Sequence, residues 1–107
     1  MKLRIVIVES RAEYADKLEY FISREKGYTV AGRFESAQSL LDAAREMAAR
    51  KAREWDLLLL SLSLPDSDGW SITQQLRALL PEVPVISYTV LESAESFLRG
   101  IRPTDPS

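Results

Sequence analysis

The sequence predicts an α/β protein with a parallel β-sheet that is covered by helices on both faces. Three observations support this fold class. Short β-branched or leucine-rich runs alternate with longer segments whose apolar residues recur at helical spacing. Glycine and proline residues fall between these segments. The strand–helix order repeats four times, and such alternation produces parallel sheets through right-handed crossovers.

The first strand–helix unit lies at the start of the chain. Residues 3–8 (LRIVIV) form a β-branched run that is typical of a strand buried on both faces. A helix is expected next, because apolar residues recur at helical spacing at Tyr14, Leu18, Phe21 and Ile22. Gly27 then acts as a stop signal.

The second unit combines a weaker strand with a long helix. Residues 28–34 (YTVAGRF) predict the strand, and Ser36 is typical of a helix N-cap. The helix after Ser36 is expected to end near Trp55. Its apolar positions are Leu40, Leu41, Ala44, Met47 and Ala48.

The third unit contains the most apolar stretch of the chain. Residues 57–62 (LLLLSL) predict a central strand, and residues 64–69 (LPDSDG) have the composition of a turn. Asp66 and Asp68 are expected to shape this turn and to cap a helix that starts near Trp70. That helix carries Ile72, Leu76, Leu79 and Leu80, and Pro81 stops it.

The last unit begins with residues 83–90 (VPVISYTV), which predict a fourth strand with Pro84 at its entrance. Ser93 is expected to cap a final short helix that holds Phe97, Leu98 and Ile101. Two prolines in the tail predict disorder there. The chain is therefore expected to form one domain over residues 1–101, followed by a disordered tail over residues 102–107.

The composition excludes several classes of chemistry. The 107 residues include no histidine and no cysteine, which excludes imidazole bases, disulfides and thiolate metal sites. Fourteen basic residues against 16 acidic ones give a net charge of −2, which does not favour direct nucleic-acid contact. The sequence contains neither a membrane-length apolar stretch nor a signal peptide, so a cytoplasmic protein is expected.

Three motifs resemble one known family. Residues 5–9, 56–69 and 84–89 are similar to the strand and loop motifs of the receiver domain of two-component response regulators. The resemblance covers residues 3–101. It implies a flavodoxin-like, doubly wound sheet of order 2-1-3-4-5, with the functional site at the carboxyl ends of the strands. The 107 residues are expected to lack the fifth strand and the final helix of that fold.

The resemblance also places the site residues. The family's phosphoacceptor aspartate corresponds to Ser61, and its two acidic Mg²⁺ ligands correspond to Glu9 and Ser10. Thr89 occupies the switch position, and a bulkier Val90 follows it. The lysine that the family carries on a fifth strand has no counterpart here. The resemblance therefore implies a degenerate site that is not an enzyme.

Phosphoryl transfer needs a metal held by carboxylates and a cation on the transferred group. Ser61 removes the nucleophile and Ser10 removes a ligand, so no cofactor is expected and Mg²⁺ binding is not favoured. Ser61 is interpreted as a hydroxyl that bonds to nearby backbone, with modification by a Ser/Thr kinase as the alternative. Glu9 is interpreted as a solvated remnant of the vestigial acidic pocket.

Surface contacts are expected near the fourth strand. Without a fifth strand this apolar strand becomes an edge, and exposed edges recruit further strands. Without a final helix, Phe21 or Ile22 is partly uncovered. We therefore expect a homodimer or a protein partner at strand four and its neighbouring helices, with neither a membrane nor direct nucleic-acid contact. The possible interface residues are Trp70, Tyr88 and Phe97. Partial burial of Trp70 against the sheet is the first interpretation of that residue.

Three hypotheses for function follow. The first is a degenerate receiver that acts as a phosphorylation-independent signalling or protein-interaction module. The second is a fragment of a conventional two-component phosphorelay regulator. The third is a small flavodoxin-like ligand-binding domain or enzyme. Against the third, residues 9–13 (ESRAE) contain no glycine that would let backbone amides cradle a phosphate.

Overall fold

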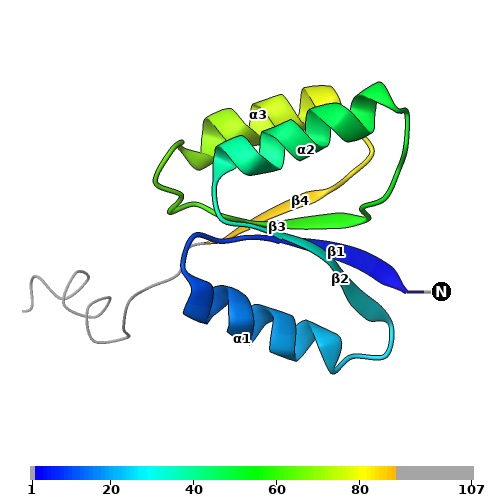
Figure 1. Ribbon diagram of the computed structural model, residues 1–107, viewed down its shortest axis with the longest axis vertical. Coiled ribbons are helices and arrows are strands. Elements are labelled where there is room, and N and C mark those ends of the chain that lie inside the picture. Colours follow the sequence, from blue (N-terminus) through cyan, green and yellow to red (C-terminus); the bar gives the residue numbers. More distant parts are fainter. Residues whose placement is uncertain (1, 89–107) are drawn as a thin grey trace, which may run out of the picture.

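The computed structural model describes residues 2–88 of the chain, and its elements follow the predicted order (Figure 1). The elements are β1 (Leu3–Val8), α1 (Ala12–Ser23), β2 (Tyr28–Phe34), α2 (Ala37–Ala49), β3 (Leu57–Ser61), α3 (Gly69–Leu79) and β4 (Val85–Tyr88). The predicted end of strand four, the predicted last helix and the tail over residues 102–107 lie outside the described residues.

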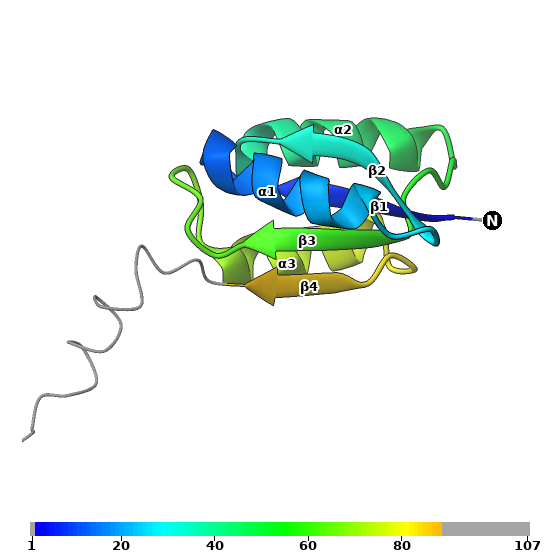
Figure 2. The same cartoon turned by 90° about the horizontal axis from the view of Figure 1, so that it is seen from below.

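The four strands form one parallel sheet in the order β2-β1-β3-β4. This order confirms the predicted doubly wound topology, in which the chain runs from β1 out to β2 and then crosses back to β3. All four arrowheads point to the same edge of the sheet (Figure 2). The loops that follow β1 and β3 therefore meet at one edge, which positions the candidate site.

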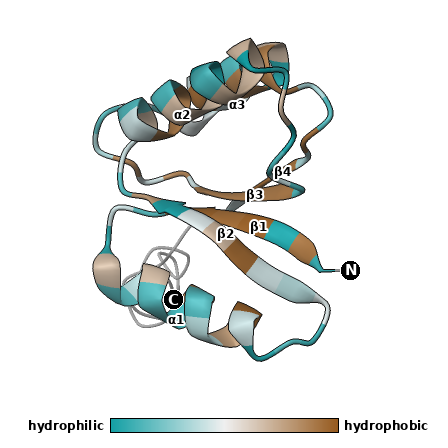
Figure 3. Cartoon of the chain, turned by 45° about the vertical axis from the view of Figure 1, so that its right-hand side comes forward, coloured by the Kyte–Doolittle hydropathy of each residue, from teal (hydrophilic) through white to brown (hydrophobic). Residues whose placement is uncertain are grey.

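The main core lies between the sheet and the pair of helices α2 and α3 (Figures 1 and 3). Alternation along the strands sends every second side chain to this face. The fully buried members of the core are Val6, Val8, Leu40, Ala44, Leu58, Leu60 and Ile72.

Ser36 accepts a hydrogen bond from the Ser39 backbone N–H, which confirms the predicted N-cap of α2.

Among the described residues, α1 is the one helix that covers the opposite face of the sheet (Figure 1). Only Ala15 of this helix is buried, and Phe21 is 64% exposed. Leu59 of β3 is half-buried, and its register partner on β4, Ile86, is 51% exposed. This face is therefore apolar and only partly covered by the described residues, as expected for Phe21.

Several boundaries differ from the predicted ones. Helix α2 ends at Ala49 and not near Trp55, because Lys51 adopts a left-handed backbone conformation (φ 54°) that ends the helix. Trp55 is nevertheless buried, and its ring packs against that of Phe34 with centroids 5.7 Å apart. Strand β4 begins only at Val85, because Pro84 has no N–H to donate to a strand neighbour. Strand β3 ends one residue earlier than predicted, at Ser61.

An ion pair joins β1 to the start of β3 and makes stability depend on pH. The Asp56 carboxylate accepts hydrogen bonds from the Arg4 guanidinium at 2.9 Å and from the Arg4 backbone N–H at 2.8 Å. These bonds lower the pKa of Asp56 to about 2. The unfolded chain has the ordinary aspartate pKa of about 3.9. The ionised carboxylate therefore adds stability above about pH 4, and this is lost as pH falls through about 2.

We expect urea denaturation between pH 6 and pH 2 to show this loss in the unaltered chain. Asp56→Asn is expected to be less stable at pH 6, and the difference between the two proteins should shrink toward pH 2. Other carboxylates titrate in both proteins, so the difference isolates Asp56. A difference that stays constant over this pH range would contradict the prediction.

Candidate functional site

The carboxyl ends of the strands lie at one edge of the sheet (Figure 2), and the strand register places a row of polar residues there. Ser61 is the last residue of β3, and its register partner is Tyr88 at the end of β4. Val8 pairs with Leu60, so Glu9, which follows Val8, comes level with Ser61. Glu9, Ser61 and Tyr88 therefore lie side by side across β1, β3 and β4.

Ser61 is completely buried at the end of the central strand. Its Oγ accepts a hydrogen bond from the backbone N–H of Ser63 at 3.2 Å. This contact supports the interpretation of Ser61 as a hydroxyl that bonds to nearby backbone. A completely buried hydroxyl is also inaccessible to a protein kinase unless the fold opens, which argues against modification at this position.

Glu9 is not the solvated side chain that the sequence suggested, because only 2% of it is exposed. Its Oε2 accepts a hydrogen bond from the Arg11 backbone N–H at 3.0 Å, and its Oε1 accepts one from the Tyr88 hydroxyl at 2.7 Å. A buried carboxylate is tolerated only when its oxygens are hydrogen-bonded. The two donors therefore explain how this carboxylate remains inside the fold.

Tyr88 is half-buried and reaches across the end of the sheet to Glu9. Burial and the neighbouring Glu9 carboxylate raise the pKa of the Tyr88 hydroxyl well above its usual value. The hydroxyl thus stays protonated and remains a hydrogen-bond donor. The sequence indicated Tyr88 only as a possible interface residue, and the spacing of 79 residues between the two partners gave no local signal of this contact.

Of three other predicted site residues, the structure describes only Ser10. Ser10 is half-buried beside Glu9 in the loop after β1. Thr89 at the switch position and Phe97 at the predicted interface lie outside the described residues, so their roles stay predictions.

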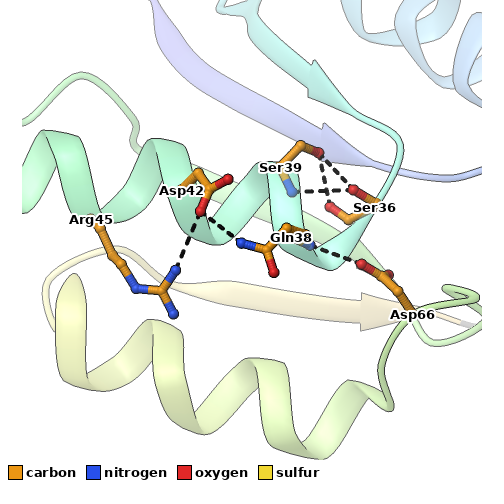
Figure 4. A network of polar contacts seen from close by, with 6 residues as sticks. All are labelled: Ser36, Gln38, Ser39, Asp42, Arg45 and Asp66. Carbon is orange, nitrogen blue, oxygen red and sulfur yellow. Dashed lines mark hydrogen bonds and ion pairs between the residues drawn. The ribbon is translucent and has the colours of Figure 1, made fainter.

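Two aspartates organise the loop between β3 and α3, and only one of them does what the sequence predicted. Asp68 caps α3, as expected, by accepting a hydrogen bond from the Ser71 backbone N–H at 2.7 Å. Asp66 instead caps a different helix. Its two oxygens accept the backbone N–H groups of Ala37 and Gln38 at 2.9 and 3.0 Å, at the start of α2. Figure 4 shows the hydrogen bond to Gln38 beside the Ser36 cap.

The helix-capping contact of Asp66 ties the loop after Ser61 to α2. Hydrogen bonds from the two amides lower the pKa of the Asp66 carboxyl, so it stays ionised at the positive end of the helix dipole. Asp66 and Asp68, near the end of this loop, thus connect it to the starts of α2 and α3.

Trp70 is more exposed than predicted, with 70% of its surface accessible. The sequence suggested partial burial against the sheet, but Gly69 takes the inner position of α3 and directs Trp70 outward. A Cβ at Gly69 would approach a Leu62 methyl within 2.1 Å, so this position admits no side chain without rearrangement. Trp70 lines a shallow groove with Leu62, Thr73, Arg77 and Ser87.

Of Glu9, Ser61 and Tyr88, Glu9 alone carries a carboxylate. Among residues 2–88, no three His, Cys, Asp or Glu side chains come close enough together to hold a metal ion. Within the same residues, no helix is both long and apolar enough to span a membrane.

Comparison with known proteins relates this chain to response regulators. The family model of the response regulator receiver domain matches residues 5–103. The transcriptional regulatory protein CreB of Escherichia coli (strain K12) is 33% identical over 95 residues. These residues make up 89% of this chain but only 38% of CreB, so the chain spans less than half of that relative.

Solved structures share the fold at low identity. A CheY-like receiver domain from Methanospirillum hungatei JF-1 superposes with a TM-score of 0.69 at 22% identity, over 95% of this chain and 75% of that chain. A structure of two RcsB dimers bound to two parallel DNAs gives a TM-score of 0.73 at 15% identity, over 88% of this chain and 48% of that chain.

Proposed function

The chain belongs to the response regulator receiver domain family, and we propose that it is a degenerate receiver that signals through protein contacts without being phosphorylated. The observation that carries the proposal is Ser61. By its sequence resemblance, Ser61 corresponds to the phosphoacceptor position of the family. It is completely buried, and its hydroxyl already accepts the Ser63 N–H. A serine hydroxyl is a weak nucleophile unless a base activates it. The adjacent carboxylate, Glu9, is already engaged by two donors.

The residues present do not fit the Mg²⁺ ion that the family uses. Mg²⁺ prefers an octahedral set of oxygens that includes one or two carboxylates. Glu9 is the only carboxylate in the row, and its Oε1 and Oε2 each accept a protein hydrogen bond. Ser10 and Ser61 supply neutral hydroxyls in place of the family's aspartates. We therefore propose a non-enzymatic domain without a metal cofactor. We also propose that the domain is cytoplasmic, as the sequence analysis expects.

The test is incubation of the purified chain with phosphoramidate and Mg²⁺, followed by intact-mass analysis. We expect no gain in mass under conditions that phosphorylate a receiver domain with an intact aspartate. A stable adduct of one phosphoryl group on the unaltered chain, absent from Ser61→Ala, would overturn the proposal. The same result would favour the second candidate, a receiver within a conventional transcriptional regulator. The relation to CreB, a transcriptional regulatory protein, supports that candidate.

We propose a second copy of this chain as the partner, bound at the edge of β4. Within residues 2–88, β4 pairs with β3 on one side only, and Ile86 on this strand is 51% exposed. Its register partner Leu59 is half-buried, and Phe21 of α1 is 64% exposed. Sheet edges and apolar patches of this kind are typical association surfaces. RcsB, which shares the fold, has been solved as dimers.

Sedimentation equilibrium over a concentration series tests the dimer. We expect Ile86→Lys to weaken dimerisation by more than about tenfold, because the added charge is placed at the contact in both copies. Ala31→Lys is the matched control, since Ala31 is an exposed position of β2 at the opposite edge of the sheet. A monomer at all concentrations, or equal effects of the two variants, would exclude this interface.

A further inference from the structure

The hydrogen bond between Tyr88 and Glu9 joins two strands that are not neighbours. Tyr88 ends β4 and Glu9 follows β1, and β3 runs between these strands. Neighbouring strands lie about 4.8 Å apart, so the bond bridges strands that are roughly 10 Å apart. The two side chains must therefore cross the end of β3.

The residue at the crossing point is Ser61. It is the register partner of Tyr88, and Glu9 comes level with it from the other side. Ser61 has no exposed surface and Glu9 has 2%, although both lie at the end of the sheet where loops normally leave an open cleft. Burial of both side chains is the expected consequence of a side-chain bridge across this edge.

We propose that the Tyr88–Glu9 bridge closes the pocket over Ser61 and is a block to metal and phosphodonor binding that is separate from the loss of the acidic residues. The bridge acts in two ways. The Tyr88 hydroxyl occupies Oε1 of Glu9, which a cation would otherwise coordinate, and the tyrosine ring covers the approach to Ser61. The inference rests on the proposed function, because it explains how a receiver without its metal satisfies the remaining buried carboxylate.

The proposal has a consequence that loss of the acidic residues alone does not have. Restoring carboxylates at Ser10 and Ser61 leaves the bridge in place, so an incoming cation has to displace the Tyr88 hydroxyl first. The restored pocket should therefore bind Mg²⁺ poorly until Tyr88 is also changed. Tyr88→Phe removes the hydroxyl and keeps the ring, whereas Tyr88→Val removes both and keeps a residue that favours strands.

Calorimetric titration with MgCl₂ tests this in the full chain. The reference protein is the double variant Ser10→Asp/Ser61→Asp, and Tyr88→Phe or Tyr88→Val is added to it. We expect each added substitution to tighten Mg²⁺ binding by at least about tenfold, a change equivalent to about 1.4 kcal/mol. Circular dichroism checks the fold of each variant, and the conservative Tyr88→Phe keeps the test valid if Tyr88→Val unfolds.

The outcomes separate this inference from the proposed function. Equal Mg²⁺ affinity in the double variant and in the folded Tyr88→Phe triple variant would overturn the bridge as a block, and would leave the proposal of a phosphorylation-independent receiver intact. Phosphorylation of the unaltered chain at Ser61 would overturn the proposed function instead. Tyr88→Phe alone, with Ser10 and Ser61 retained, is the matched control. It should gain no comparable affinity, because only one carboxylate is then present.

Discussion

Leu60→Ala is expected to lower the free energy of unfolding by about 3 kcal/mol, within the roughly 2–5 kcal/mol typical of Leu→Ala changes in well-packed cores. Leu60 has no exposed surface and lies in the cluster between the sheet and the α2–α3 pair. The substitution leaves a cavity among residues that are held by two helices, so the site cannot collapse freely. A loss of this size is a large part of the roughly 5–15 kcal/mol that stabilises a domain.

Leu59→Ala is the matched control, because Leu59 is the neighbouring leucine on the opposite face of β3. Alternation along the strand places it on the α1 side of the sheet, and its side chain is half-buried. We expect about half the effect of Leu60→Ala, measured by urea denaturation at low protein concentration. Equal losses for the two variants would show that the α1 face is as well covered in solution as the α2–α3 face, which contradicts the uncovered surface described above.

Tyr88→Phe is expected to lower the free energy of unfolding by about 1–3 kcal/mol, because it leaves a buried charged acceptor without its donor. Glu9 is 2% exposed, and among residues 2–88 its other oxygen accepts a hydrogen bond from the Arg11 N–H alone. The phenylalanine ring keeps the packing of the tyrosine ring, so the loss reports the hydrogen bond rather than the apolar contact.

Tyr28→Phe provides the comparison for this second prediction. Tyr28 also lies on a strand and is 42% exposed, and its hydroxyl makes no hydrogen bond with the described residues. Thermal denaturation of both variants should show a clear drop in melting temperature for Tyr88→Phe and little change for Tyr28→Phe. Similar melting temperatures for the two variants would mean that water replaces the Tyr88 hydroxyl at Glu9 without cost.

Local patterns were sufficient for most of the architecture. The bounds of β1 and β2 match the predicted runs over residues 3–8 and 28–34, because alternating β-branched residues and flanking turn residues mark a strand directly. The caps at Ser36 and Asp68 were also predictable, since each bonds an amide only three residues away. Boundaries set by backbone geometry, such as the left-handed Lys51 that ends α2, had no clear signal in the residue type.

The sequence by itself determined the element order, the parallel sheet and the serine at position 61 in place of an aspartate, because these follow from residue identity and local periodicity. Only the tertiary structure decided which polar groups meet. Asp66 caps α2, 29 residues away from Ala37, and Glu9 is buried against Tyr88 from the far side of β3. Such contacts depend on how the sheet brings distant segments together. The residue type alone does not distinguish a buried carboxylate from a solvated one. The difference lies in the hydrogen-bond donors that folding places around the carboxylate.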